Sequence, residues 1–228
     1  MRYDIINMFP STVYVGEMEG HSEYRKTFYD KIYPEYDYAD DATVSEGEGK
    51  PIIHTEESAR PMMEEITRHI KNYYLQILGL KDIFDVYHTK TWLSRSRHVE
   101  QLIPQHIHAP SHISYAYYLN VPEGSPYLTF TEVQGKNEVF SSCFYTYPDG
   151  ESFVNEHTFE STQTYSIESK EGTICIFPSS RPHRTDCDSE VFSGERLAIS
   201  GDCILALKED EKMVYVNGYT HPKYWRKY

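Results

Sequence analysis

The sequence predicts a mainly β protein, a sandwich or jelly roll in which a long helix precedes the strands. Short strand-forming runs follow one another from Phe84 to Leu207, and turn formers such as Pro122-Glu123-Gly124 separate most of them. The long helical pattern comes before these runs and not between them, which disfavours a parallel sheet. A chain of 228 residues with 39% hydrophobic content is long enough for one domain with a real core.

Residues 1–83 are expected to form N-terminal strands and supporting helices. Two short apolar runs in Tyr3–Val15 predict two strands, and Tyr24–Tyr33 has helical spacing. The segment Pro34–Pro51 carries six acidic residues and two glycines, so we expect a solvated loop there.

A longer helix is predicted from about Thr55 to Leu78, ended by Gly79. Pro61 is tolerated only in a first turn, so either Thr55 or Ser58 is the expected cap. Apolar residues recur at spacings of three and four, and we expect them to pack on one outer face of the sheet: Met62, Ile66, Ile70, Tyr73, Tyr74 and Ile77.

The jelly-roll core is expected over residues 84–207, followed by an aromatic C-terminal tail over residues 208–228. The tail is too aromatic for a disordered end, so it should pack on the body of the protein or on the second subunit of a homodimer. The predicted strands are Phe84–Leu93, Ile103–His108, Ile113–Val121, Tyr127–Glu132, Val139–Tyr147, Thr162–Ile167, Thr173–Phe177 and Arg196–Leu207.

The composition excludes several classes of function. A formal net charge of −13 argues against a surface that binds along a nucleic-acid backbone. The N-terminus lacks the pattern of a signal peptide, and no segment approaches the roughly 20 apolar residues that span a bilayer. Four cysteines without a C-x-x-C pair indicate free thiols. We therefore expect a soluble, cytoplasmic protein.

Three histidines form the first pattern in the sequence that indicates a chemical function. His106 and His108 lie two apart, so on an extended strand both side chains face one ion. His183 follows a buried-strand pattern 75 positions after His108, where antiparallel strands can bring it to the same place. Neutral imidazole suits iron, zinc, copper or nickel, so these residues form a candidate metal site, with His112 as an alternative ligand.

An arginine follows the third histidine on another strand. Arg196 lies 13 residues after His183, and Ala198 and Ser200 share its face of the strand. A guanidinium on an inward face beside a metal is suited to bind a carboxylate through two parallel hydrogen bonds.

The motifs HIHAPSHISYAYYLNVPEG, FPSSRPHR and GERLAIS resemble the Fe(II)/2-oxoglutarate-dependent dioxygenases, in particular the 2OG-Fe(II) oxygenases of bacteria and phages, which are related to prolyl hydroxylases. With the opening MFPSTVYV, the resemblance covers essentially the whole chain. It implies a double-stranded β-helix with its metal site at the mouth, using Fe(II), 2-oxoglutarate as co-substrate and O2.

The resemblance also implies roles for individual residues. The family pattern of His-x-Asp/Glu and a distant His maps onto His106, His108 and His183, with histidine in the position usually held by a carboxylate. Arg196 would bind the distal carboxylate of 2-oxoglutarate, and Tyr118 and Ser200 would complete its hydrogen bonds. No substrate role is assigned to Trp92, Arg95 or Arg97.

Two other functions fit parts of the pattern. Gly172, Pro178 and His183 match the spacing of a cupin motif, so a three-histidine enzyme or small-ligand binder without 2-oxoglutarate is the alternative, and Arg196 distinguishes the two. A structural protein that kept the barrel and lost its chemistry is the third. Similarity to prolyl hydroxylases makes a peptidyl proline or another amino-acid side chain the first substrate to consider, with a modified nucleobase or a small metabolite as alternatives.

Overall fold

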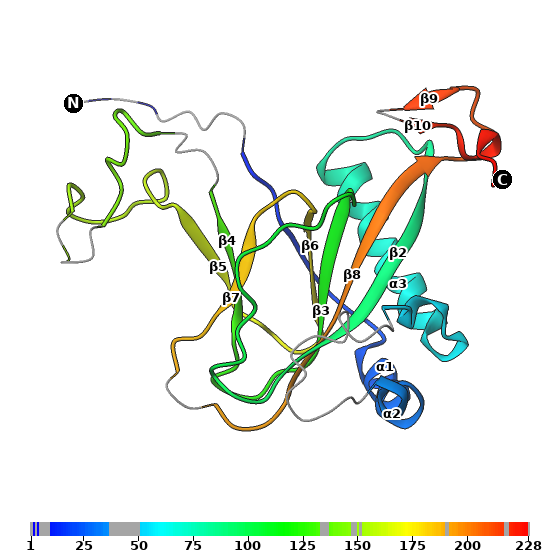
Figure 1. Ribbon diagram of the computed structural model, residues 1–228, viewed down its shortest axis with the longest axis horizontal. Coiled ribbons are helices and arrows are strands. Elements are labelled where there is room, and N and C mark those ends of the chain that lie inside the picture. The colour runs from blue at the N-terminus through cyan, green and yellow to red at the C-terminus, as the bar shows by residue number, and fades with distance from the viewer. Residues whose placement is uncertain are drawn as a thin grey trace.

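Two antiparallel sheets face each other in the computed structural model, which describes residues 2, 4, 10–36, 51–132, 137–146, 150, 152–189, 192–216 and 219–227 (Figure 1). One sheet has the strand order β1-β6-β3-β8-β2 and the other β5-β4-β7. The strands are β1 Tyr14–Glu17, β2 Phe84–Ser96, β3 Ile113–Asn120, β4 Tyr127–Thr131, β5 Thr164–Ile167, β6 Thr173–Pro178, β7 His183–Asp186 and β8 Arg196–Leu207. This arrangement confirms the predicted mainly β jelly roll.

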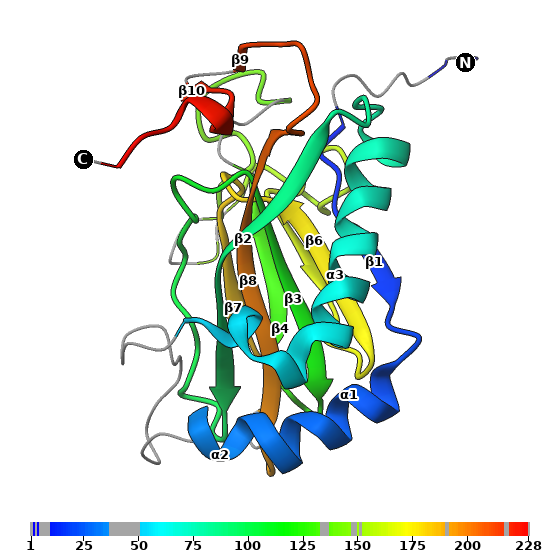
Figure 2. The ribbon, with the colours of Figure 1, turned by 90° about the vertical axis from the view of Figure 1, so that its right-hand side faces the viewer.

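Helices cover the outer face of the five-stranded sheet. Figure 2 shows α3 running along that face, with α1 and α2 crossing its lower end. The helical elements are α1 His21–Thr27, a π-helical turn Phe28–Ile32, α2 Tyr33–Tyr36, 3-10 turns Ile53–Thr55 and Glu57–Ala59, α3 Arg60–Asn72 and a π-helical turn Tyr73–Ile77. The expectation that the long helix buttresses the sheet is confirmed.

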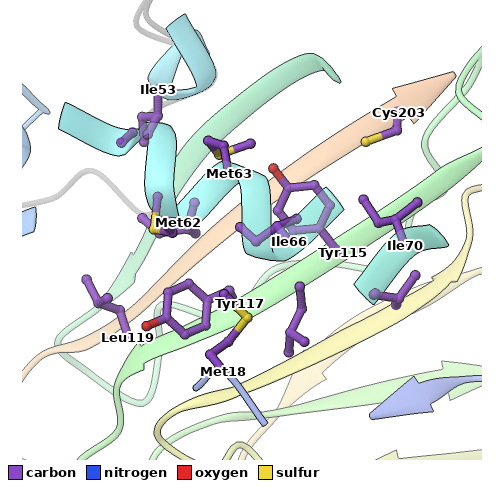
Figure 3. Packing of buried hydrophobic residues seen from close by; sticks show 14 of the residues in the cluster. Met18, Ile53, Met62, Met63, Ile66, Ile70, Tyr115, Tyr117, Leu119 and Cys203 are labelled. Atoms are coloured by element: carbon purple, nitrogen blue, oxygen red, sulfur yellow. The ribbon is translucent and has the colours of Figure 1, made fainter. Parts of the chain in front are cut away.

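Hydrophobic residues pack on both faces of the five-stranded sheet. On the outer face, Ile66 and Ile70 of α3 lie against Tyr115 and Tyr117 of β3, all at most 1% exposed (Figure 3). A second, smaller cluster fills the space between the sheets, and it contains Ala116, Tyr118, Leu128, Phe130, Cys175, Phe177 and Ala198. Alternate residues of the same strands therefore pack into two different hydrophobic cores.

The start of α3 differs from the prediction. Its N-cap is Ala59, which makes no side-chain hydrogen bond, while Thr55 and Ser58 lie in separate 3-10 turns. Pro61 does occupy the first turn. Ile77 is 51% exposed. It lies in the π-helical turn, where the larger number of residues per turn points its side chain away from the buried face of α3. The other five predicted apolar positions are buried.

Two predicted strands are wrong, and strand β7 of the smaller sheet escaped prediction. Residues 103–108 form a loop with one isolated bridge, partly because Pro104 has no N–H to donate. Residues 139–146 form mainly turns, with Val139 and Phe140 exposed. The missed strand β7 has the polar sequence HRTD, which lacks the apolar alternation that signals a strand. The first of the two strands expected in Tyr3–Val15 lies mostly outside the described residues, as do residues 37–50 of the acidic loop.

The C-terminal tail forms a small hairpin of β9 Tyr215–Val216 and β10 Tyr219–Thr220, followed by a 3-10 turn Pro222–Tyr224. His221 anchors it, since its ring is 1% exposed and lies 2.7 Å from the backbone oxygen of Lys208. Tyr224 and Trp225 remain about half exposed. His221 therefore holds the end of the tail against the residue that follows β8. No helix in the described ranges is long and apolar enough to cross a membrane.

His88 connects the outer face of the sheet to α3. Its Nε2 lies 2.9 Å from Oγ1 of Thr67, and its Nδ1 lies 3.3 Å from Sγ of Cys203 on β8. Burial, with a smaller effect of His54, lowers the pKa of His88 to about 4. The folded protein therefore holds this imidazole neutral where an unfolded chain would protonate it.

We predict that the free energy of unfolding of the metal-free protein falls as the pH is lowered from about 6.5 to 4. In that window the unfolded chain takes up a proton that folded His88 does not, which gives a slope of up to about 1.4 kcal/mol per pH unit for each such group. His88→Gln should make the slope shallower in urea titrations at several pH values. The exposed His98→Gln is the control, and an unchanged slope in His88→Gln would contradict the assignment.

Candidate metal centre

Three histidines from two segments meet at one end of the space between the sheets. His106 forms an antiparallel bridge with His183, the first residue of β7, through backbone hydrogen bonds of 2.9 and 3.1 Å. The backbone N–H of His108 donates to the carbonyl oxygen of Ser179 at 2.9 Å, which ties the loop to the end of β6. The expected strand is replaced by this bridged loop, yet both side chains still reach His183.

Hydrogen bonds orient all three imidazoles in the same way. The Nδ1 atom of His106 donates to the carbonyl oxygen of Pro104 at 2.8 Å, and that of His183 donates to the carbonyl oxygen of Arg181 at 2.9 Å. The Nδ1 atom of His108 donates to Oδ1 of Asp202 at 2.7 Å. A proton on each Nδ1 leaves each Nε2 as the nitrogen that can bind a metal.

The spacing of the three rings fits a single ion. One potential ligand atom from each histidine lies within 4.8 Å of the others, and the Nε2 atoms of His106 and His108 are 2.9 Å apart. Two nitrogens bound to one metal at about 2.1 Å and at right angles are about 3 Å apart. Burial lowers the pKa of His183 to about 4, with smaller effects from its neighbours, so its ring is neutral and available at neutral pH.

A cavity of about 430 Å³ extends from the histidines between the two sheets. Trp92, Ala116 and Ala198 of the five-stranded sheet line one side, and Leu128 and Thr185 of the three-stranded sheet line the other. A larger hollow, of about 600 Å³, lies on the outer surface along α3 among mostly charged side chains, and the three histidines are not part of it. The cavity between the sheets is therefore the candidate site.

Arg196 and Tyr118 line this cavity and leave polar atoms unpaired. Both residues are at most 3% exposed, and neither Nε of Arg196 nor the hydroxyl of Tyr118 has a hydrogen-bond partner among the described residues. The Arg196 guanidinium lies 5.2 Å from the centre of the Tyr118 ring and 3.4 Å from Oγ of Ser169. Burial raises the pKa of Tyr118 to about 12 and lowers that of Arg196. A buried guanidinium without a carboxylate partner in the described part of the chain fits an anionic ligand.

The other predicted residues are distributed as follows. Ser200 lines the cavity, as expected from its position on the face of Arg196. His112 is not part of the cluster, because its Nδ1 accepts a hydrogen bond from the backbone N–H of Leu205 at 3.0 Å. Arg95 donates to Tyr33 on the helical side, and Arg97 pairs with Glu195 at 2.7 Å.

Two site residues escaped the sequence analysis. Trp92 stacks on His108 with ring centres 5.5 Å apart, and Asp202 binds the same ring. Asp202 continues the alternation of Arg196, Ala198 and Ser200 along β8, so extending that alternation by one step would have found it. Trp92 lies opposite Ser200 in the strand pairing, which sequence alone does not fix.

The fold is thus a jelly roll in which three histidines converge and a buried arginine lines the same cavity. The chain belongs to the 2OG-Fe(II) oxygenase family, whose sequence profile, described as "Putative 2OG-Fe(II) oxygenase", matches residues 90–202. It is accordingly an enzyme of that family. A comparison with curated proteins found no match in sequence.

Solved structures share the fold at low sequence identity. A prolyl hydroxylase from Trichoplax adhaerens, in complex with a peptide fragment of the hypoxia inducible factor oxygen degradation domain, is 11% identical, with a TM-score of 0.51 over 84% of this chain and 83% of that one. AviO1 from Streptomyces viridochromogenes Tue57 is 9% identical, with a TM-score of 0.51 over 85% and 90%. A Pseudomonas putida prolyl-4-hydroxylase is 13% identical, with a TM-score of 0.49 over 85% and 92%.

We predict that His183→Ala weakens binding of Co(II), used as a probe for a divalent metal, by more than about 100-fold, because removing even a partner of a ligand commonly costs 10- to 100-fold. His112→Ala is the matched control and should bind Co(II) like the unmodified chain. The visible spectrum of the bound ion, followed during titration, reports both affinities. Equal losses in the two variants would contradict the proposed ligand set.

Proposed function

We propose that this protein is an Fe(II)- and 2-oxoglutarate-dependent oxygenase that hydroxylates an unactivated C–H bond. One observation carries the proposal: a buried guanidinium with no acidic partner among the described residues lines the same cavity as three converging imidazoles. A metal site alone fits many enzymes. A carboxylate-binding arginine in the same closed space is what distinguishes this family's chemistry from a cupin-like alternative.

The metal would be held by His106, His108 and His183. Three protein ligands on one side of an ion leave positions for a co-substrate and for O2. The three rings lie in contact, with centres 4.3 to 5.0 Å apart, and their Nδ1 hydrogen bonds support fixed orientations. O2 would be the oxidant: bound Fe(II) would activate it, and 2-oxoglutarate would supply the two electrons that O2 needs beyond those taken from the C–H bond.

The distal carboxylate of 2-oxoglutarate would bind at Arg196. Its guanidinium can donate two parallel hydrogen bonds to a carboxylate, and the hydroxyl groups of Tyr118 and Ser200 line the same cavity. Such a carboxylate would pair the Nε and the phenol that have no partner among the described residues. Apolar residues around the cavity, including Leu128 and Phe177, exclude water and strengthen these charge interactions.

We propose an amino-acid side chain within a peptide as the substrate, with proline first. Residues 137–146 and 152–163 follow the end of β4, where Phe130 pairs with His183, so this segment leaves the barrel beside the metal centre. It exposes Phe140, Phe153 and Phe159, which are 55%, 68% and 73% accessible. Exposed aromatic side chains on a segment that begins beside the three histidines suit a large partner, such as a polypeptide, better than a small metabolite.

We predict that Arg196→Ala weakens binding of 2-oxoglutarate by at least about 30-fold, since losing one partner of a buried charged pair costs 2 kcal/mol or more. Anaerobic titration of the Fe(II)-loaded protein with 2-oxoglutarate measures this through the visible charge-transfer band of the chelated keto acid. Iron binding should be retained.

Arg184→Ala provides the matched control for this experiment. Arg184 also lines the cavity, but it is paired with Asp186 at 2.8 Å and donates to Thr131. It should therefore leave the 2-oxoglutarate affinity nearly unchanged. If iron binds to the unmodified protein and no band forms, the co-substrate assignment fails and the three-histidine enzyme without 2-oxoglutarate takes its place.

A further inference from the structure

We propose that Asp202 is a positioning residue for the metal centre. It orients His108, and it places a negative charge one ring away from the metal. In the usual family pattern, that negative charge belongs to a metal ligand itself. The inference rests on the proposed function, because it takes His108 as a ligand. The usual pattern has a carboxylate at this position, and this chain has an imidazole in its place.

The contacts of Asp202 single it out among the carboxylates of the described residues. Its side chain is fully buried, and its Oδ1 accepts hydrogen bonds from Nδ1 of His108 at 2.7 Å and from the hydroxyl of Ser114 at 2.6 Å. The ammonium of Lys90 lies 3.2 Å from its Oδ2. Lys90 also lies 4.8 Å from the centre of the Trp92 ring, which stacks on His108.

Strand pairing explains how the carboxylate reaches the imidazole. Asp202 pairs with both Ser114 of β3 and Lys90 of β2, so it has a polar neighbour on each side within the sheet. A β-bulge lies between His88 and Lys90. The extra residue lets His88 face the helices while Lys90 and Trp92 face Asp202 and the cavity. Bulges often re-aim side chains next to active sites in this way.

A purely structural role explains these contacts poorly. Burying a carboxylate costs several kcal/mol before its partners compensate, and an apolar residue of similar volume is often as stable. Oδ2 moreover lacks a hydrogen bond of good geometry among the described residues, although Lys90 is close. The carboxylate is directed at the one imidazole whose position departs from the family pattern.

Two consequences for the metal follow from this geometry. The hydrogen bond keeps the proton on Nδ1 of His108, so that Nε2 faces the ion, and it makes the imidazole a stronger electron donor. The Asp202 carboxylate also places a negative charge one ring away from the metal, with Oδ1 on the His108 side and Lys90 paired with Oδ2. Three neutral imidazoles would otherwise leave a divalent ion at +2, whereas a carboxylate ligand would leave it near +1.

A double-mutant cycle between Asp202 and His108 tests the proposal. In the unmodified background, Asp202→Asn should weaken Co(II) binding by about 10- to 100-fold, the usual cost of losing such a partner. In the His108→Asp background, which restores a carboxylate in the ligand position, Asp202→Asn should leave Co(II) affinity unchanged or raise it, since two carboxylates would otherwise lie side by side. Equal losses in both backgrounds would overturn the proposal, as would no loss in the unmodified one.

Asp186→Asn is the control for the general effect of a negative charge near the cavity. Asp186 pairs with Arg184 and contacts none of the three histidines, so Co(II) affinity should stay within about 2-fold of the unmodified value. An unmodified protein that binds no Co(II) would refute the proposed metal centre itself. That result differs from one in which the metal binds and Asp202→Asn has no effect.

A measurement on the unmodified chain covers the case in which Asp202→Asn does not fold. In protein labelled with 15N in histidine and loaded with Zn(II), His108 should show a protonated Nδ1 with a strongly downfield proton and a metal-bound Nε2. The resonance is assigned by its absence from His108→Asp. A metal-bound Nδ1 in His108 would overturn the proposal.

Discussion

The two-sided strand β8 is the element on which the rest of the structure depends. It pairs with β2 from Arg196 to Leu207, along its whole length, and with β3 from Leu197 to Cys203. Leu197 and Ile199 face the helices, whereas Arg196 and Ser200 face the cavity. A shift of one residue in its pairing would exchange these two sets and put the guanidinium into the helical core.

Sequence patterns predicted the parts of the molecule that follow strict periodicity. β8 begins and ends at the predicted residues, and the helix that buttresses the sheet was found from the spacing of Ile66 and Ile70. The two histidines of the H-x-H motif and His183 do converge. These features depend on local alternation or on single conspicuous residues, both of which can be read along the chain.

Features that depend on pairing across the sheet could not be predicted in the same way. The polar strand β7 exists because β4 and the bridge to His106 hold it, not because its own residues favour a strand. The stacking of Trp92 on His108 depends on a β-bulge whose position has no signal in the sequence. The loop at residues 103–108 presents its histidines correctly although it is not the strand that was expected.

The three histidines lie where the two sheets are joined. His183 begins a strand of the smaller sheet, and the loop bearing His106 and His108 pairs with His183 on one side and is tied to the larger sheet through Ser179 and Asp202 on the other. An ion bound by all three would act as a cross-link between the sheets. Because it binds the closed barrel and not the opened one, it would resist separation of the sheets at this end and slow unfolding from there. Such an ion would contribute to the mechanical integrity of the protein as well as to its chemistry.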